Sequence, residues 1–174
     1  QRNVLENPVW YTSYTPYQAE ISQGRLEALF NFQSVITDLT ALPLSNCSLL
    51  DEATAGAETA FLLFNERSKA KVKLGARKLF VDKDVFASTR DVILTRCIPQ
   101  GIEVVLGKWN EFDFGAEFFG AIVQYPGSLG GVNAYSEFVA KAHDAAITVG
   151  VAADLLGLVL LTHPEEWGDD VVFG

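Results

Sequence analysis

Short apolar runs alternate with helical segments along much of this sequence. Apolar runs of strand length occupy residues 78–82, 102–106, 119–125 and 147–153. Segments with helical length and spacing, residues 86–97 and 135–146, lie between members of that series. Because buried strands separated by helices need crossover connections, the pattern predicts a mostly parallel sheet with helices on both faces. We therefore expect a three-layer α/β fold.

The first part of the chain has a different pattern. Residues 1–21 combine prolines, aromatic residues and hydroxyl side chains without a helical or alternating period, which favours an extended arm. A helix is expected from Ser22, because apolar residues then recur at helical spacing until Pro43 closes the segment. Residues 22–174 are expected to form one partial domain. The sequence contains no methionine, so we expect it to be an internal segment of a longer protein.

Composition and charge exclude several classes of function. A formal net charge of -9 opposes binding to nucleic acid and to anionic membranes. Cys47 and Cys97 match neither a zinc pattern nor a disulfide framework, which indicates a reducing compartment. His143 and His163 have no second ligand at metal spacing, so no metal site is expected, and His143 is expected to face solvent. The glycine-rich fingerprints of nucleotide-binding proteins are missing.

Parallel sheets bind ligands at the carboxyl ends of their strands, which points to residues 125–127 and to Asp154. A lone carboxylate after an apolar run is expected to be partly desolvated. Asp154 therefore fits either a helix cap for Leu155 onward or a carboxylate that holds a cationic ring nitrogen. The small residues at 53–58 predict a strand-to-helix turn, which could hold a phosphate on free N–H groups or simply allow close packing.

Aromatic, hydroxyl and amide side chains are concentrated in residues 10–25, a segment without core periodicity. A domain of this size does not need such a segment in order to fold. It could line an active site or pair subunits. Both interpretations are compatible, because many active sites lie at interfaces.

Five strings in this chain resemble those of one known family. Residues 14–29, YTPYQAEISQGRLEAL, are similar to a signature of the amino-terminal half of glycine decarboxylase, the P-protein of the glycine cleavage system. Four further strings follow in the family's order: NCSLLDEATA at 46–55, VQYPG at 123–127, AADLL at 152–156 and EWG at 166–168. The resemblance covers the whole chain.

This resemblance implies a fold and an activity. The fold would be part of the large domain of fold type I pyridoxal-phosphate (PLP) enzymes. The activity would be that of glycine dehydrogenase (decarboxylating), an oxidoreductase that releases carbon dioxide from glycine and passes the aminomethyl group to the lipoyl arm of the H-protein. PLP would serve as the electron sink. The expected location is the bacterial cytoplasm or the mitochondrial matrix.

The resemblance also implies roles for particular residues. Asp154 would hold the pyridine nitrogen of PLP, and Ala55 with Gly56 would lie near its phosphate, in an arrangement that could be inherited without a bound cofactor. The arm would supply catalytic side chains to a shared site: Tyr14, Thr15, Tyr17, Gln18, Glu20 and Ser22.

The family's PLP-binding lysine is expected outside this chain, since no lysine follows Asp154 here and an imine with PLP needs that amine. The expected partners are therefore the carboxy-terminal half or subunit of the P-protein, the lipoylated H-protein and glycine, in an oligomer, without nucleic acid or membrane. The isolated chain is expected to be inactive. The alternative is a structural fragment of the large domain with no catalytic role.

Overall fold

The computed structural model describes residues 2–7 and 25–174. The chain forms two compact units, one of residues 1–38 with 42–47 and one of residues 39–41 with 48–174. The predicted boundary between the arm and the domain, at residues 21 and 22, lies outside the described residues. Within the described part of the chain, no helix is both long enough and apolar enough to cross a membrane.

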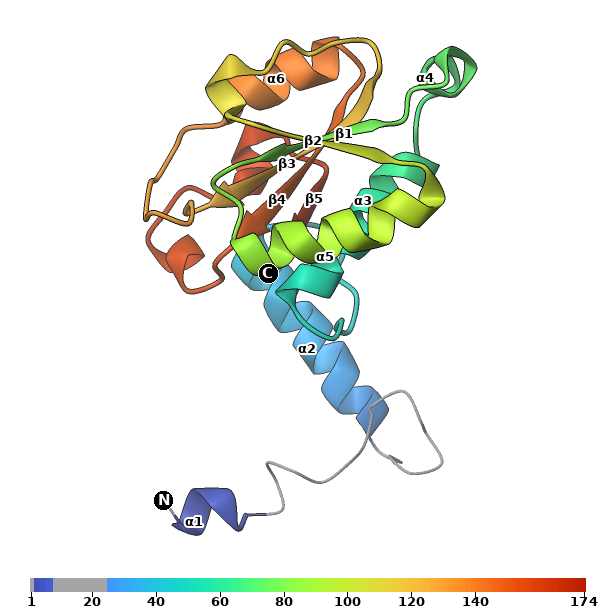
Figure 1. Ribbon diagram of the computed structural model, residues 1–174. Coiled ribbons are helices and arrows are strands. Elements are labelled where there is room, and N and C mark those ends of the chain that lie inside the picture. The colour runs from blue at the N-terminus through green and yellow to red at the C-terminus, as the bar shows by residue number, and fades with distance from the viewer. Residues whose placement is uncertain (1, 8–24) are drawn as a thin grey trace. The chain divides into compact units, whose positions relative to one another are not determined.

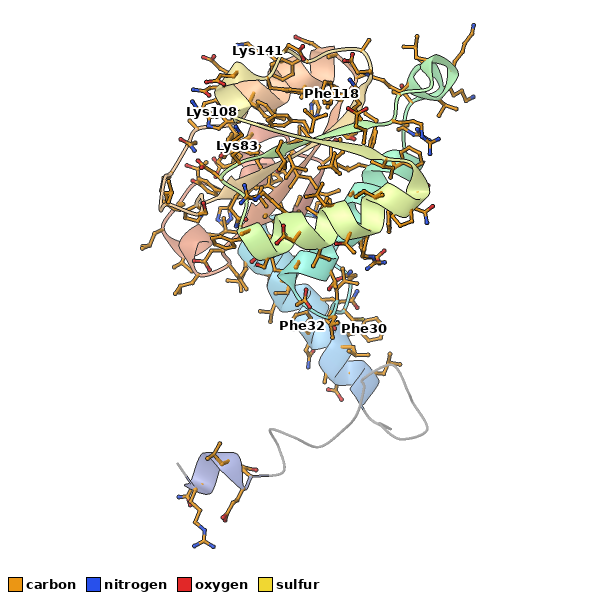
Figure 2. All side chains as sticks on the ribbon, viewed as in Figure 1. Phe30, Phe32, Lys83, Lys108, Phe118 and Lys141 are labelled. Atoms are coloured by element: carbon orange, nitrogen blue, oxygen red, sulfur yellow. The ribbon has the colours of Figure 1, made fainter. Side chains whose placement is uncertain are left out.

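The described part of the smaller unit contains two helices, α1 (Arg2–Leu5) and most of α2 (Arg25–Thr40). The expectation of an extended arm is wrong at residues 2–5, which form a helical turn, and Arg2 and Glu6 make an ion pair of 2.8 Å across it. The predicted second helix is confirmed over Arg25–Thr40. Its apolar side chains include Phe30 and Phe32, which are exposed (Figure 2).

The larger unit is built on a five-stranded sheet, and all of its neighbouring strands run parallel. The spatial order is β2-β1-β3-β4-β5. In chain order the strands are β1 (Lys78–Asp82), β2 (Glu103–Gly107), β3 (Phe118–Tyr125), β4 (Thr148–Ala153) and β5 (Val171–Phe173). The chain runs outward from β1 to β2 and then returns past β1 to build β3, β4 and β5 in the opposite direction. The order therefore reverses between β1 and β3, which makes that boundary a topological switch point.

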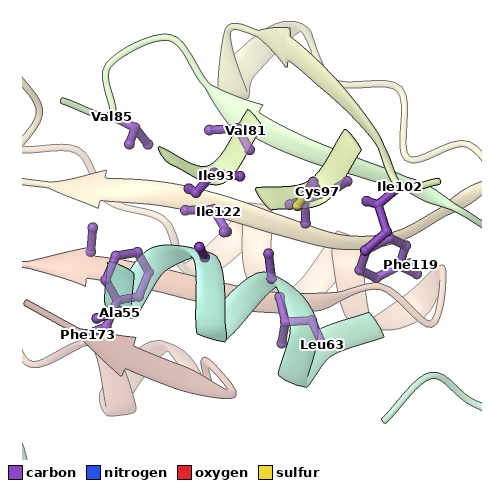
Figure 3. Close-up of a cluster of buried hydrophobic side chains, with 14 of the residues drawn as sticks. Ala55, Leu63, Val81, Val85, Ile93, Cys97, Ile102, Phe119, Ile122 and Phe173 are labelled. Atoms are coloured by element: carbon purple, nitrogen blue, oxygen red, sulfur yellow. The ribbon is translucent and has the colours of Figure 1, made fainter. Parts of the chain in front are cut away.

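Helices cover both faces of the sheet, as the sequence predicts (Figure 1). One face carries α3 (Glu52–Asn65) and α5 (Ala87–Cys97), and the other carries α6 (Ser136–Asp144). The short helix α4 (Lys69–Leu74) precedes β1, and four 3-10 turns complete the unit: η2 (Ile98–Gln100), η3 (Trp109–Glu111), η4 (Gly157–Val159) and η5 (Pro164–Trp167). The apolar side chains between the sheet and the α3–α5 layer include Leu63, Cys97 and Ile122 (Figure 3). The three-layer α/β prediction is confirmed.

One local prediction is wrong: residues 53–58 are helix rather than a strand-to-helix turn. The helix α3 begins at Glu52 because Asp51 and Thr54 form a reciprocal capping box. The Asp51 carboxylate accepts from the N–H of Thr54 at 2.7 Å, and the Thr54 hydroxyl accepts from the N–H of Asp51 at 3.1 Å. The small residues that suggested a turn are the face that α3 buries against the rest of the unit.

Close packing of α3 on the sheet depends on glycine. A Cβ atom added to Gly150 of β4 would lie 2.9 Å from the methyl group of Thr59 on α3. On the helix side, a Cβ atom on Gly56 would come within 3.0 Å of the methyl group of Thr89 and 3.1 Å of the ring of Phe173. Because glycine has no side chain, Gly56 and Gly150 together set how closely α3 can approach the sheet.

We expect Gly150→Ala to lower the free energy of unfolding by about 1 to 3 kcal/mol, because the added methyl group overpacks the contact with Thr59. Gly131→Ala is the matched control, since the nearest atom to a Cβ there is 3.9 Å away. Urea unfolding midpoints of the two variants measure the difference. Equal midpoints would contradict the packing role of Gly150.

Candidate functional site

The carboxyl ends of β1, β3 and β4 meet at one edge of the sheet, and the switch point between β1 and β3 lies on that edge. This edge is where doubly wound sheets bind their ligands. The residues that end these strands are Asp82, Tyr125 and Ala153, the last followed by Asp154. The candidate site is built around them.

Asp82 ends β1 and is 1% exposed. Burial raises the pKa of its carboxyl group, and the charge of Asp84 acts in the same direction, whereas backbone hydrogen bonds from Asp84, Trp109 and Lys83 oppose the shift. One carboxyl oxygen, Oδ2, has no hydrogen-bond partner among the described residues. Asp82 is therefore a buried acid whose charged form is only partly compensated.

Gln124 and Tyr135 lie across the switch point from Asp82 and are also buried. The Tyr135 hydroxyl donates to the main-chain carbonyl of Gln124 at 3.2 Å and accepts from the amide of Asn133 at 3.3 Å. Burial raises the pKa of Tyr135 to about 12, and the carboxylates of Asp82 and Asp84 add to the shift. The side chains of Tyr135, Asn133 and Asp82 form one polar cluster under the loop that follows β3, whereas the side chain of Gln124 accepts from the N–H of Phe86 at 3.5 Å.

The loop after β3 is tied to the loop after β1. The Tyr125–Pro126 peptide bond is cis. The N–H of Ser128 donates to the carbonyl of Asp84 at 2.8 Å, and a Cβ on Gly127 would meet the Asp84 Cβ atom at 3.2 Å. Only a small residue at 127 lets the two loops approach this closely.

Aromatic rings cover the polar cluster. Tyr125 contacts the ring of Trp167 edge to face at 4.6 Å, and Tyr135 contacts Trp109 at 5.3 Å and Trp167 at 5.7 Å between ring centres. Because Asp82, Gln124 and Tyr135 are at most 1% exposed, a substrate does not reach them in this form. The cluster can hold a proton and fix the two loops, and it supports the surface above it rather than contacting a reactant.

Asp154 has a different environment from the one the sequence predicts. It is exposed, so the expected partial desolvation is wrong. Its carboxylate accepts from the N–H of Leu156 at 3.1 Å, and its carbonyl accepts from the N–H of Leu158 at 3.2 Å. In this structure Asp154 caps the turn that follows β4, which is the first of the two interpretations. A contact with a ring nitrogen stays a prediction.

Ala55 and Gly56 lie in the second turn of α3 and are buried. The N–H of Ala55 donates to the carbonyl of Asp51 at 2.9 Å, and Gly56 faces Thr89 and Phe173. Both residues therefore serve the packing of α3. The phosphate contact assigned to them stays a prediction.

The six arm residues with predicted catalytic roles, Tyr14, Thr15, Tyr17, Gln18, Glu20 and Ser22, lie outside the described residues. Their arrangement stays a prediction.

The lysines give a direct test of whether this chain can hold PLP as an imine. Lys83 and Lys108 follow β1 and β2 at the carboxyl edge, but both are exposed, and Lys108 pairs with Glu111 at 3.0 Å. Lys71 is buried and its pKa is lowered by desolvation, yet its ammonium group donates to the carbonyl of Ala116, which precedes β3 at the opposite edge. The described residues therefore offer no desolvated amine at the site, and they do not fit an imine-bound PLP by themselves.

A metal site has no support in the described part of the chain, where no three His, Cys, Asp or Glu side chains group as ligands. His143 is exposed, as predicted, and its Nε2 atom lies 3.0 Å from Asp170. Asp170 also accepts from the N–H of Val149 at 2.7 Å. Neighbouring Asp169 is partly buried, and desolvation with the charge of Asp170 raises its pKa to about 6. These groups lie at the amino ends of β4 and β5, away from the candidate site.

The sequence interpretation missed Asp82, Gln124 and Tyr135. The sequence did contain a signal for Asp82, because this residue ends the apolar run at 79–81. Asp154 ends the apolar run at 147–153 in the same way. Gln124 and Tyr135 carry no such signal: a lone glutamine in a strand and a tyrosine before a helix are ordinary residues. Asp82 and Gln124 end up near each other because β1 and β3 are neighbours in the sheet, and Tyr135 joins them through its hydrogen bond to the Gln124 carbonyl.

Comparison with known proteins identifies one family. The sequence model of the family described as "Glycine cleavage system P-protein" matches residues 1–174. "Glycine dehydrogenase (decarboxylating)" of Bacteroides thetaiotaomicron is 59% identical over 174 residues, which is all of this chain and 18% of that protein. The protein of the same name from Synechocystis sp. is 52% identical over all of this chain and 17% of its own length. The chain thus spans less than a fifth of these relatives.

A solved structure is similar to this chain and belongs to the same family. The crystal structure of glycine decarboxylase (P-protein) of the glycine cleavage system, in inhibitor-bound form, superposes on 98% of this chain and 39% of its own chain. The TM-score is 0.81 and the sequence identity is 29%. This likeness confirms the family resemblance seen in the sequence.

We expect Asp82→Asn to change how stability depends on pH. A carboxyl group with a raised pKa stabilises the folded state below its unfolded pKa, and that contribution is lost as pH rises through the folded pKa. The free energy of unfolding of Asp82→Asn, relative to that of the unsubstituted protein, should therefore increase as pH rises from the unfolded to the folded pKa and then level off. Thermal unfolding midpoints between pH 4 and pH 8 measure it.

Asp91→Asn is the control, because Asp91 is exposed on α5. A difference between Asp82→Asn and the unsubstituted protein that stays constant with pH would contradict the buried, uncompensated carboxylate.

Proposed function

The chain belongs to the glycine cleavage system P-protein family, and from that membership we propose that it is part of a glycine dehydrogenase (decarboxylating). In the proposed reaction glycine loses its carboxylate as carbon dioxide, and the aminomethyl group passes to the lipoyl group of the H-protein. PLP would supply the electron sink for the loss of the carboxylate. This segment would contribute to that site without holding the cofactor as an imine.

The observation that supports this proposal is that the chain matches a P-protein family but has no lysine placed to bind PLP. The chain matches a P-protein family along its whole length, yet none of its lysines lies desolvated at the carboxyl edge. An imine with PLP requires such an amine. The lysine is therefore assigned to the remainder of the polypeptide or to another subunit, and this segment to one wall of a composite site.

The arm would be the part of this segment that meets the substrate. Tyr14, Thr15, Tyr17 and Ser22 would bring hydroxyl groups, Gln18 an amide, and Glu20 a carboxylate. Hydroxyl and amide groups can orient the glycine carboxylate before it leaves, and a carboxylate can hold or move a proton. The resemblance of residues 14–29 to the family signature supports these roles.

The carboxyl edge of the sheet would act as a support for that site. Asp82 and Tyr135 are buried; Asp82 accepts from the N–H of Asp84 in the loop after β1, and Tyr135 donates to the Gln124 carbonyl near the end of β3, so their proposed role is positioning. Asp154 would be the last polar side chain of this edge. Its hydrogen bond from the N–H of Leu156, which caps the following turn, forms without a cofactor.

In the full-length P-protein, with PLP and lipoylated H-protein, we expect Tyr17→Phe and Glu20→Gln each to lower the rate of carbon dioxide exchange with glycine by at least about tenfold. The reason is the loss of a hydroxyl or carboxylate contact made in the transition state. The absorbance of the PLP imine should persist, because its lysine lies elsewhere.

Tyr11→Phe is the matched control, since Tyr11 is in the same segment but outside the predicted set. The competing proposal is a purely structural segment. Unchanged exchange rates in all of the arm variants would favour that proposal and contradict the composite site.

A further inference from the structure

The turn after β4 exposes a group of aliphatic side chains at the carboxyl edge. Leu156 is 78% exposed, Val159 67% and Leu160 89%. We call these three residues the leucine patch. No Asp, Glu, Lys or Arg occurs between Asp154 and Glu165, although the whole chain carries a net charge of -9. Three exposed aliphatic side chains thus lie within five positions of one turn, and exposed apolar groups that gather in this way can serve as an interaction surface.

The leucine patch is held in a fixed turn. Asp154 caps the turn through the N–H of Leu156, and the N–H groups of Leu160 and Leu161 both donate to the carbonyl of Gly157 at 3.0 Å. Leu158, in the middle of the turn, is 2% exposed and belongs to the core under α6. The backbone therefore buries one leucine and directs its neighbours outward, rather than collapsing to cover them all.

The carboxyl end of β5 lies beside this turn. β5 pairs in parallel with β4, and Gly174 approaches the Ala153 carbonyl so closely that an added Cβ atom would collide with it. Ala153 is followed by the capped turn that carries the leucine patch. A polypeptide that continues after β5 would thus leave the sheet at the same edge as the patch (Figure 1).

The relatives supply a candidate for what covers this surface. They match the chain over only 17 or 18% of their length, in their amino-terminal part, so most of a P-protein polypeptide lies beyond the matched segment. An uncharged aliphatic surface is best covered by an apolar surface that excludes water, and a charged or lipoyl-bearing partner that must dissociate in each cycle fits it less well.

We propose that the leucine patch is the docking surface for the polypeptide that follows this segment in the full-length P-protein. The inference rests on the proposed function, because it takes the rest of the P-protein to be the partner. It goes further by assigning Leu156, Val159 and Leu160 to the contact that seals the carboxyl edge.

The test uses full-length P-protein with Cys47→Ser as background and a single added cysteine, Leu156→Cys or Leu160→Cys. Cys97 is buried and burial raises its pKa to about 11, so it reacts slowly. Alkylation rates at the added cysteine are measured by mass spectrometry in native and denatured protein. Leu74→Cys on α4 is the matched control, because Leu74 is 67% exposed.

We expect the added thiols of Leu156→Cys and Leu160→Cys to react at least about tenfold more slowly in native than in denatured protein, since the thiol reacts only when the contact opens. The added thiol of Leu74→Cys should react at similar rates in both. Native rates at 156 and 160 as fast as those at 74 would overturn the proposal. Protection that vanishes on dilution would also overturn it, because a second copy would then be the occupant.

Hydroxyl-radical footprinting of the unsubstituted protein covers the case in which a substitution itself disrupts docking. Leucines 156 and 160 should be protected relative to Leu74 in the same sample. Measuring glycine exchange on that preparation separates the two proposals. Protection without exchange would contradict the proposed function alone, and exchange without protection would contradict the docking surface alone.

Discussion

All five strands of the sheet run in one direction, and this determines where the chain places its polar side chains. Because β1, β3 and β4 all end at one edge, three separate apolar runs deliver Asp82, Tyr125 and Asp154 to the same side of the molecule. The reversal of strand order between β1 and β3 opens that edge at one point, and the buried polar cluster lies there. The absence of side chains at Gly56 and Gly150 lets α3 lie close to the sheet and keeps the strands covered on that face.

The sequence predicts the architecture well because the period of its apolar residues reports directly on burial. Strands buried on both faces and helices between them leave a clear pattern, and the strands β1 to β4 and the helices α2, α5 and α6 agree with it. Small residues at 53–58 predict a turn, but these residues are helical in α3. Alanine favours helix, and the box of Asp51 with Thr54 fixes the first turn, so local capping outweighed the expectation.

The site was less predictable because burial at a strand end depends on what later parts of the chain place over it. Asp82 and Asp154 follow similar apolar runs, yet one is buried and the other exposed. Backbone from Trp109 after β2 and the ring of Tyr135 before α6 enclose Asp82. After β4 the chain turns outward at once, with Asp154 as its cap. No local pattern in the sequence distinguishes these two outcomes.

In the proposed function this chain forms one wall of a site whose PLP-binding lysine lies elsewhere in the P-protein. The decisive experiment is to add PLP to the 174-residue chain, reduce with borohydride and measure the mass. We expect no imine absorbance and no covalent pyridoxyl group on this chain, with both present on the full-length protein. A pyridoxyl group fixed stoichiometrically to one lysine of this chain would contradict it.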